Sequence, residues 1–101
     1  MIVTLVEFHL PQAITLEEAT RKFEVNKSSY KGFDGLLRKT YLVSEDGKTV
    51  AGLYFWNSRA AAEKMYNSEW RERVPKLYGV EPKLTWYESP LSVENEPIKA
   101  A

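Results

Sequence analysis

Four residues on two neighbouring stretches of the chain combine an amine with aromatic rings: Lys39, Tyr41, Tyr54 and Trp56. Each pair is spaced by two, so on extended strands the side chains of a pair project to one face. Pockets for small molecules usually have aromatic walls and a few polar groups, and this face has that composition. The alternative is an ordinary core in which Lys39 extends past the rings to water. A lysine among buried aromatic residues is unusual, so both interpretations stand.

His9 is the single histidine of the chain, and histidine is the side chain that titrates near neutral pH. As a base it would suit removal of a phenolic proton. The alternative is a histidine near solvent at the end of a strand. The absence of cysteine excludes thiolate metal sites, and a single histidine makes a transition-metal site a poor prospect, so no metal is expected. A haem could still be held by one axial histidine.

A hairpin positions the amine and the rings. Leu36 to Ser44 and Thr49 to Trp56 are rich in β-branched and aromatic residues and predict two strands. The Asp46-Gly47 pair between them predicts a type I′ turn, which needs positive φ angles. That turn predicts four opposite pairs on the face of Lys39: Val43 with Val50, Tyr41 over Gly52, Lys39 with Tyr54, and Leu37 with Trp56.

The remaining elements follow from similar signals. Ile2 to Leu10 predicts a strand, and Thr15 with Glu18 forms a capping box for a helix that runs to about Asn26. A second helix begins after Asn57 or Ser58 and carries Tyr66 inward. A further helical turn begins at Ser68, buries Trp70, is interrupted by Pro75 and closes at Gly79. Pro82 to Glu88 predicts the last strand. We expect one domain over residues 1–90 and a tail over 91–101.

The order βαββαβ predicts an α+β, ferredoxin-like fold with an antiparallel sheet ordered 4-1-3-2 and both helical regions on one face. Both faces of the first and third strands are apolar, so the face without helices needs a cover. A second copy of the chain is the simplest one, which predicts a homodimer in the form of a dimeric α+β barrel. His9 and Trp56 are expected near opposite ends of the sheet, too far apart for one small substrate to touch both. If a pocket exists, it is therefore centred either on His9 and Tyr41 or on Trp56 and Trp70.

The composition narrows the partners. The 101 residues carry 14 acidic and 14 basic side chains, so the basic excess typical of nucleic-acid binders is absent. The apolar N-terminal stretch has no basic segment before it and is too short to span a bilayer, so we expect no membrane partner and a cytoplasmic location. One RNA-binding alternative shares the element order: an RRM would display Tyr54 and Trp56 to solvent for base stacking.

Several segments together resemble a known family. They are Leu5-Val-Glu-Phe-His-Leu10, Gly35-Leu-Leu-Arg-Lys-Thr-Tyr41, Ala51-Gly-Leu-Tyr-Phe-Trp-Asn-Ser58, Leu77-Tyr-Gly-Val80 and Pro90-Leu-Ser92. In order and spacing they resemble the YdhR-like monooxygenase family, within the dimeric α+β barrels related to antibiotic-biosynthesis monooxygenases.

The resemblance implies cofactor-independent oxygenation of an electron-rich aromatic molecule, such as a hydroquinone or phenol, in a cleft between sheet and helices. Such a site must remove a phenolic proton and stabilise the phenolate. His9, Lys39 and Tyr54 are the candidate catalytic residues. Tyr41, Trp56, Tyr66 and Trp70 are the candidate residues for binding the substrate. A dimeric protein that binds an aromatic metabolite without turnover would need the same pocket and remains an alternative.

Overall fold

The computed structural model describes residues 1–95, and within them the elements follow the predicted order, with the second helical region divided in two. The predicted tail lies beyond the last strand: residues 91–95 contain no helix or strand, and residues 96–101 lie outside the described part. None of the helices in residues 1–95 is long and apolar enough to cross a membrane. The elements are β1 (Ile2–His9), α1 (Leu16–Asn26), the 3₁₀ turn η1 (Lys27–Ser29), β2 (Leu36–Val43), β3 (Thr49–Trp56), α2 (Arg59–Met65), α3 (Ser68–Tyr78) and β4 (Lys83–Glu88).

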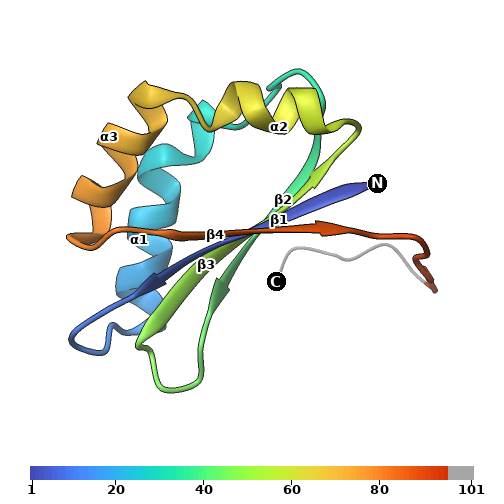
Figure 1. The fold of residues 1–101 in the computed structure, drawn as a ribbon. Coiled ribbons are helices and arrows are strands. Elements are labelled where there is room, and N and C mark those ends of the chain that lie inside the picture. Colours follow the sequence, from blue (N-terminus) through green and yellow to red (C-terminus); the bar gives the residue numbers. More distant parts are fainter. Residues whose placement is uncertain (96–101) are drawn as a thin grey trace.

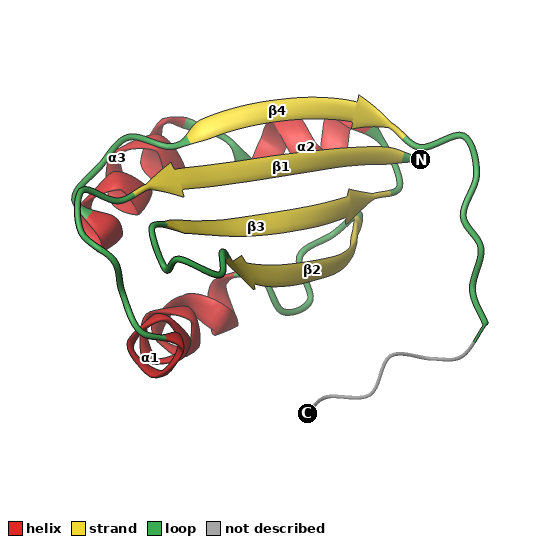
Figure 2. Ribbon diagram, turned by 90° about the horizontal axis from the view of Figure 1, so that it is seen from below, coloured by secondary structure: helices red, strands yellow, loops and turns green. Residues whose placement is uncertain are grey.

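The strands form one antiparallel sheet in the order β2-β3-β1-β4, which is the predicted order read from the other edge. The helices lie on one side of this sheet (Figure 1), and a view from below shows the strands of the other face without a helix over them (Figure 2). The chain therefore has the predicted α+β, ferredoxin-like architecture, with a covered face and an uncovered face. The capping box at Thr15 is also confirmed, since Glu18 N donates to Thr15 Oγ1 and Thr15 N donates to the Glu18 carboxylate.

The β2–β3 turn differs from the predicted two-residue type I′ turn. Gly47 has a φ of +72°, but within residues 1–95 only glycines have positive φ, so Asp46 does not supply the second positive angle. Ser44 N donates to Thr49 O over 2.9 Å, which closes a loop of the four residues between them. The Asp46 carboxylate stabilises this longer loop by accepting from Ser44 Oγ (2.7 Å) and from Lys48 N (2.9 Å). The strand register is the same for both loops.

A bulge changes the far end of β2. Leu36, not Leu37, pairs with Trp56, and Arg38 pairs with Phe55, so the ladder skips Leu37. The predicted Leu37–Trp56 pair is therefore wrong. The extra residue turns Leu37 outward, where 57% of it is exposed, and lets Leu36 pack against the core.

Pro75 does not interrupt the helical region as predicted. Helix α3 runs through it to Tyr78, and Gly79 follows in the left-handed conformation with a φ of +75°. A proline inside a helix removes one backbone hydrogen bond. Pro75 lies in the last turn of α3, so the lost hydrogen bond is close to the end of the helix. The helical region is divided between Met65 and Ser68, and α3 begins at Ser68, where the sequence predicts a further helical turn; the Asn67 side chain caps it.

A buried hydrogen-bonded group joins the sheet to the helices. Thr4 Oγ1 accepts a hydrogen bond from Trp56 Nε1 over 2.9 Å and lies 2.6 Å from the Tyr66 hydroxyl. Thr4 and Trp56 are fully buried, and Tyr66 is 5% exposed. One small hydroxyl on β1 thereby satisfies the indole of β3 and the phenol that follows α2.

We predict that Thr4→Val lowers the free energy of unfolding by about 1–3 kcal/mol, because it leaves the buried indole N–H without an acceptor. Urea unfolding followed by far-UV circular dichroism would measure the change. Thr20→Val is the matched control: Thr20 is exposed on α1 and bonds only Leu16 O, so its loss should stay within about 0.5 kcal/mol. Equal losses for the two variants would contradict the role given to Thr4.

Candidate functional site

Lys39 lies among three tyrosine rings. Its Nζ is 3.3 Å from the ring centroid of Tyr30, 4.2 Å from that of Tyr41 and 4.7 Å from that of Tyr54. No Asp or Glu within residues 1–95 forms an ion pair with it. The faces of aromatic rings attract a cation, so these rings occupy the place that a carboxylate usually has beside an enclosed amine.

The β2–β3 register creates this arrangement. Lys39 pairs with Tyr54, and Tyr41 pairs with Gly52, as predicted. A Cβ atom at position 52 would lie 3.0 Å from Lys39 Cε and 3.0 Å from Tyr54 Cε1. The residues that cover Gly52 are therefore Lys39 and Tyr54, whereas the sequence predicts Tyr41. The missing side chain at position 52 is what lets the lysine stem and the tyrosine ring lie flat on the sheet.

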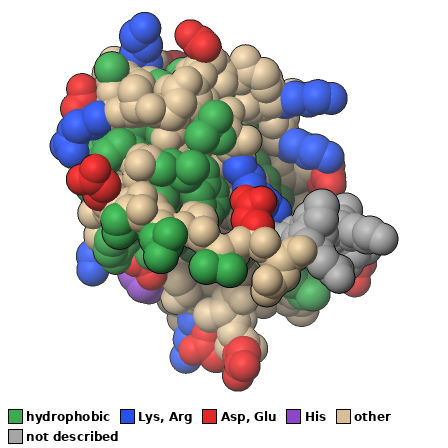
Figure 3. Space-filling view, turned by 90° about the vertical axis from the view of Figure 1, so that its right-hand side faces the viewer, with side chains coloured by type: hydrophobic (Ala, Val, Ile, Leu, Met, Phe, Trp, Pro, Cys, Tyr) green, Lys and Arg blue, Asp and Glu red, His purple; other side chains and the backbone are tan. Residues whose placement is uncertain are grey.

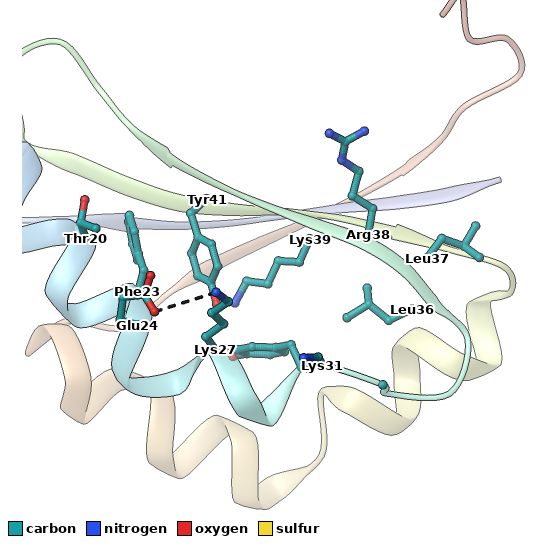
Figure 4. Close-up of a pocket in the computed structure, with 12 residues that line it drawn as sticks. Thr20, Phe23, Glu24, Lys27, Lys31, Leu36, Leu37, Arg38, Lys39 and Tyr41 are labelled. Atoms are coloured by element: carbon teal, nitrogen blue, oxygen red, sulfur yellow. Dashed lines mark ion pairs between the residues drawn. The ribbon is translucent and has the colours of Figure 1, made fainter. Parts of the chain in front are cut away.

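A pocket of about 510 Å³ opens beside this amine, between α1, η1 and β2; we call it the Lys39 pocket. Figure 4 shows Lys39 reaching from β2 toward the helices, while Arg38 points away from them. Phe23 of α1 stacks on Tyr41 with 4.5 Å between ring centroids, and the Tyr41 hydroxyl donates to Asn26 Oδ1 over 3.2 Å. The lining residues are Thr20, Phe23, Glu24, Lys27, Tyr30, Lys31, Gly32, Leu36, Leu37, Arg38, Lys39 and Tyr41.

The surroundings change the ionisation of the site. Burial, with a smaller contribution from the positive charge of Arg73, lowers the pKa of Lys39 to about 6. At pH 7 the amine is therefore mostly neutral, and its lone pair can accept a proton. Burial raises the pKa of Tyr41 and of Tyr54 above the usual range. Their hydroxyl groups keep their protons at physiological pH, and the Tyr41 hydroxyl donates its proton to Asn26 Oδ1.

His9 lies on the other face of the sheet. It pairs with Thr49, while its neighbour Phe8 is buried beneath the helices, and alternate side chains of a strand point to opposite faces. The His9 ring is exposed, with Nδ1 3.3 Å from Thr49 Oγ1. The sheet therefore stands between His9 and Lys39. A pocket that joins His9 to Tyr41, one of the two options from the sequence, is not formed by residues 1–95.

The predicted binding residues Trp56, Tyr66 and Trp70 lie in the core. Their exposed fractions are 0%, 5% and 1%, and none of them lines the Lys39 pocket. Tyr66 packs edge-on against Trp70, and the Trp70 indole donates to the Tyr30 hydroxyl over 3.3 Å. Of the seven predicted site residues, the structure brings together Lys39, Tyr41 and Tyr54, and it places the Trp56–Tyr66–Trp70 group behind them.

The burial of Tyr54 and Trp56 also removes the RNA-binding alternative. An RRM stacks bases on aromatic rings exposed on its sheet, whereas Tyr54 is 2% exposed and Trp56 is fully buried under the helices. Within residues 1–95, no three His, Cys, Asp or Glu side chains come together in a group that could hold a metal ion.

Among the residues that were not predicted for the site, Phe23 and Asn26 contact Tyr41, and the Tyr30 ring lies beside the Lys39 amine. Phe23 was detectable as part of the apolar side of a helix, but that pattern does not distinguish a pocket wall from core. Tyr30 follows η1 in a stretch of turn-forming residues, and Asn26 ends α1. Only the packing of this segment against β2 brings them to Lys39.

Solved structures with this fold include several oxygenases. A monooxygenase from the gene ActVA-Orf6 of Streptomyces coelicolor, in complex with nanaomycin D, superposes with a TM-score of 0.71 at 20% identity, covering 94% of this chain and 92% of that one. SnoaB, a cofactor-independent oxygenase from Streptomyces nogalater, gives 0.69 at 12% identity, with 93% and 97% covered. A further antibiotic biosynthesis monooxygenase gives 0.59 at 12% identity, with 88% and 98% covered.

No protein-family model matches the chain, and no curated protein matches it either. The structural similarity extends over nearly the whole length of each neighbour. The chain thus has the ferredoxin-like fold found in the antibiotic-biosynthesis monooxygenases. At these identities the likeness establishes the fold and leaves the chemistry to the residues of the site.

The low pKa of Lys39 predicts a pH-dependent stability. The folded-state value of about 6 lies below the ordinary value, so between pH 6 and pH 10 the unfolded chain holds a proton that the folded chain has released. Stability linked to Lys39 should therefore rise with pH over this range. We expect Lys39→Met to be more stable than the original chain by about 1–3 kcal/mol at pH 7, with a difference that shrinks as pH rises.

Urea unfolding at several pH values from 6 to 9 would measure this difference. Lys64→Met is the control, because Lys64 is exposed on α2 and its removal should give a small difference that does not vary with pH. A Lys39→Met difference that is equally flat would contradict the neutral amine.

Proposed function

We propose that the protein is a cofactor-independent monooxygenase that oxidises a phenol or hydroquinone in the Lys39 pocket. The observation that carries the proposal is an amine that forms no ion pair with a carboxylate of residues 1–95 and lies among tyrosine rings beside a pocket of about 510 Å³. Two neighbours of the fold support it: one is a monooxygenase in complex with nanaomycin D, and another is a cofactor-independent oxygenase. Membership of the YdhR-like family and a cytoplasmic location belong to the same proposal.

The first chemical step would be removal of the phenolic proton. The neutral amine of Lys39 accepts it, which leaves an ammonium group beside a phenolate. The charge of the new ammonium group stabilises the phenolate, and the ring faces of Tyr30 and Tyr41 stabilise the ammonium group. Proton transfer thus creates the ion pair between the ammonium group and the phenolate in the same step that removes the phenolic proton.

The phenolate then reduces O₂ directly. For a phenol with an unsubstituted ring position, one oxygen atom joins the ring, the other leaves as water, and the ring becomes a quinone. Both electron pairs come from the substrate, so the balance closes without a cofactor. The Phe23–Tyr41 stack forms an aromatic wall that excludes water from the electron-rich ring, and the protonated hydroxyl of Tyr54 is a potential hydrogen-bond donor.

Oxygen uptake with a panel of hydroquinones and polycyclic phenols tests the proposal. We expect Lys39→Met to lower kcat/KM at least about tenfold, since a positioned base contributes roughly 10²–10⁴-fold. Lys39→Arg keeps a positive charge but cannot accept a proton, so it should be equally impaired. For the original chain, kcat/KM should rise with pH through about 6, where the amine becomes neutral.

Lys64→Met should behave like the original chain in this assay. Binding of the panel compounds, followed by quenching of tryptophan fluorescence, is measured in parallel. Binding without oxygen uptake would overturn the oxygenase and favour the non-catalytic binding protein. Full activity of Lys39→Arg would contradict the role of the amine as a base.

We further propose that the chain forms a homodimer through the uncovered sheet face. Leu42 and Tyr87 on that face are 40% and 54% exposed, and Leu5, Leu53 and Phe55 beside them are half-buried. A space-filling view from the side of the N-terminus also shows hydrophobic side chains gathered on the surface (Figure 3). A contiguous apolar surface of this kind is typical of an interface.

Light scattering would test the dimer against the monomer mass of 11.7 kDa. We expect Leu42→Glu to shift the mass toward the monomer, because it buries a charge in the interface. Leu16→Glu, at an exposed position outside the sheet, should leave the mass unchanged. A monomer mass for the original chain at every concentration would refute the dimer.

A further inference from the structure

We propose a second activity for the Lys39 pocket: the amine of Lys39 captures aromatic aldehydes as a covalent imine. This goes beyond the oxygenation proposed above, because it requires neither oxygen nor a phenolic hydroxyl group. It follows from the position of a nucleophilic nitrogen at the wall of a ring-lined pocket.

The geometry gives the nitrogen of Lys39 an unusual freedom. Most enclosed lysines are held by a carboxylate, which keeps the amine protonated and blocks its lone pair. Here no Asp or Glu of residues 1–95 forms an ion pair with Lys39, and three tyrosine ring centroids lie within 4.7 Å of its Nζ. Ring faces do not bind the lone pair, so a neutral amine at this position is free to attack a carbonyl carbon.

The side chain also borders open space. Lys39 is among the residues that line the pocket of about 510 Å³, and its side chain extends from β2 into the region between sheet and helices (Figure 4). Its pKa of about 6 agrees with this geometry, since it leaves about nine-tenths of the amine neutral at pH 7. An exposed lysine of ordinary pKa is neutral to only about one part in a few thousand at that pH.

The walls select the class of carbonyl compound. Phe23 and Tyr41 are stacked, and the Tyr30 ring centroid lies 3.3 Å from the amine, so a flat ring can pack on aromatic surface while its aldehyde meets Nζ. The volume suits a molecule of one or two rings, since ligand pockets usually measure about 300–1,000 Å³. A short aliphatic aldehyde would lack these ring contacts and should gain little from the pocket.

The reaction balances without an oxidant or a reductant. The lone pair of Nζ attacks the aldehyde carbon, a carbon–nitrogen bond forms, and the carbonyl oxygen takes up a proton. The nitrogen then loses its protons as the hydroxyl group leaves as water. The products are one imine and one water molecule.

Reductive trapping tests the proposal in the whole protein. The chain is incubated at pH 7 with 2-naphthaldehyde and sodium cyanoborohydride under nitrogen, and peptide mapping by mass spectrometry compares modification at its nine lysines and at the N-terminus. We expect Lys39 to be modified at least about tenfold faster than any other lysine, because its amine is largely neutral at this pH. With propanal in place of 2-naphthaldehyde, this preference should fall several-fold.

The pH profile provides a second readout in the unaltered chain. Modification of Lys39 should be nearly constant from pH 7 to pH 9 and fall below about pH 6, whereas that of exposed lysines should keep rising to pH 9. Lys39→Arg should lose the fast modification, and Lys64→Met should retain it. Equal rates at Lys39 and at the other lysines of the folded chain would overturn the proposal. Fast trapping without oxygen uptake from phenols would keep the imine and reject the oxygenase.

Discussion

An amine that leaves water without a carboxylate partner has two ways to limit the cost: it can lie on the faces of aromatic rings, or it can give up its proton. Lys39 combines them, and much of the site follows from this constraint. The rings must come from three elements to surround one nitrogen, so the segment from α1 through η1 must pack on β2. The stem of the lysine must lie flat on the sheet over position 52 of the neighbouring strand, and that position is a glycine.

The aromatic residues behind the site complete this arrangement. Tyr54 stacks on Trp56 with 5.8 Å between ring centroids and 6° between ring planes, and Trp56 is held by the Thr4 hydroxyl. Tyr54 therefore contacts both the core, through Trp56, and the site, through Lys39. The tryptophans that the sequence places in a pocket act one step away from it: they fix the orientation of the rings that touch the amine.

The architecture was largely predictable because its signals are local. The capping box at Thr15, the bounds of β3 and the pairing of Lys39 with Tyr54 depend on patterns of a few residues, and the strand order follows from general rules of chain connection. The predictions of a type I′ turn and of a Leu37–Trp56 pair were wrong for local reasons that a pattern of period two does not contain. Asp46 stabilises a longer loop through its carboxylate, and Leu37 is an added residue in the ladder.

The site was only partly predictable because its members meet through long-range packing. Lys39, Tyr41 and Tyr54 share one hairpin, so strand alternation was sufficient to group them. Tyr30 and Asn26 reach the same place from a segment without periodicity, and no pattern in the sequence connects them to the hairpin. For the tryptophans, the sequence indicated burial but not what surrounds the side chain. An aromatic residue such as Trp56 at the end of a strand gives the same sequence pattern whether it lines a cavity or fills a core.

The bulge at Leu37 has a consequence for the edge of the sheet. β2 is an edge strand, and a regular edge offers unpaired backbone groups on which another chain can add a strand. The skipped residue distorts that edge close to Arg38 and Leu36, which line the Lys39 pocket. A foreign strand that docked there would lie beside residues of the pocket. The irregular ladder makes this part of the edge a poor template for strand addition, so the bulge at Leu37 disfavours self-association next to the Lys39 pocket.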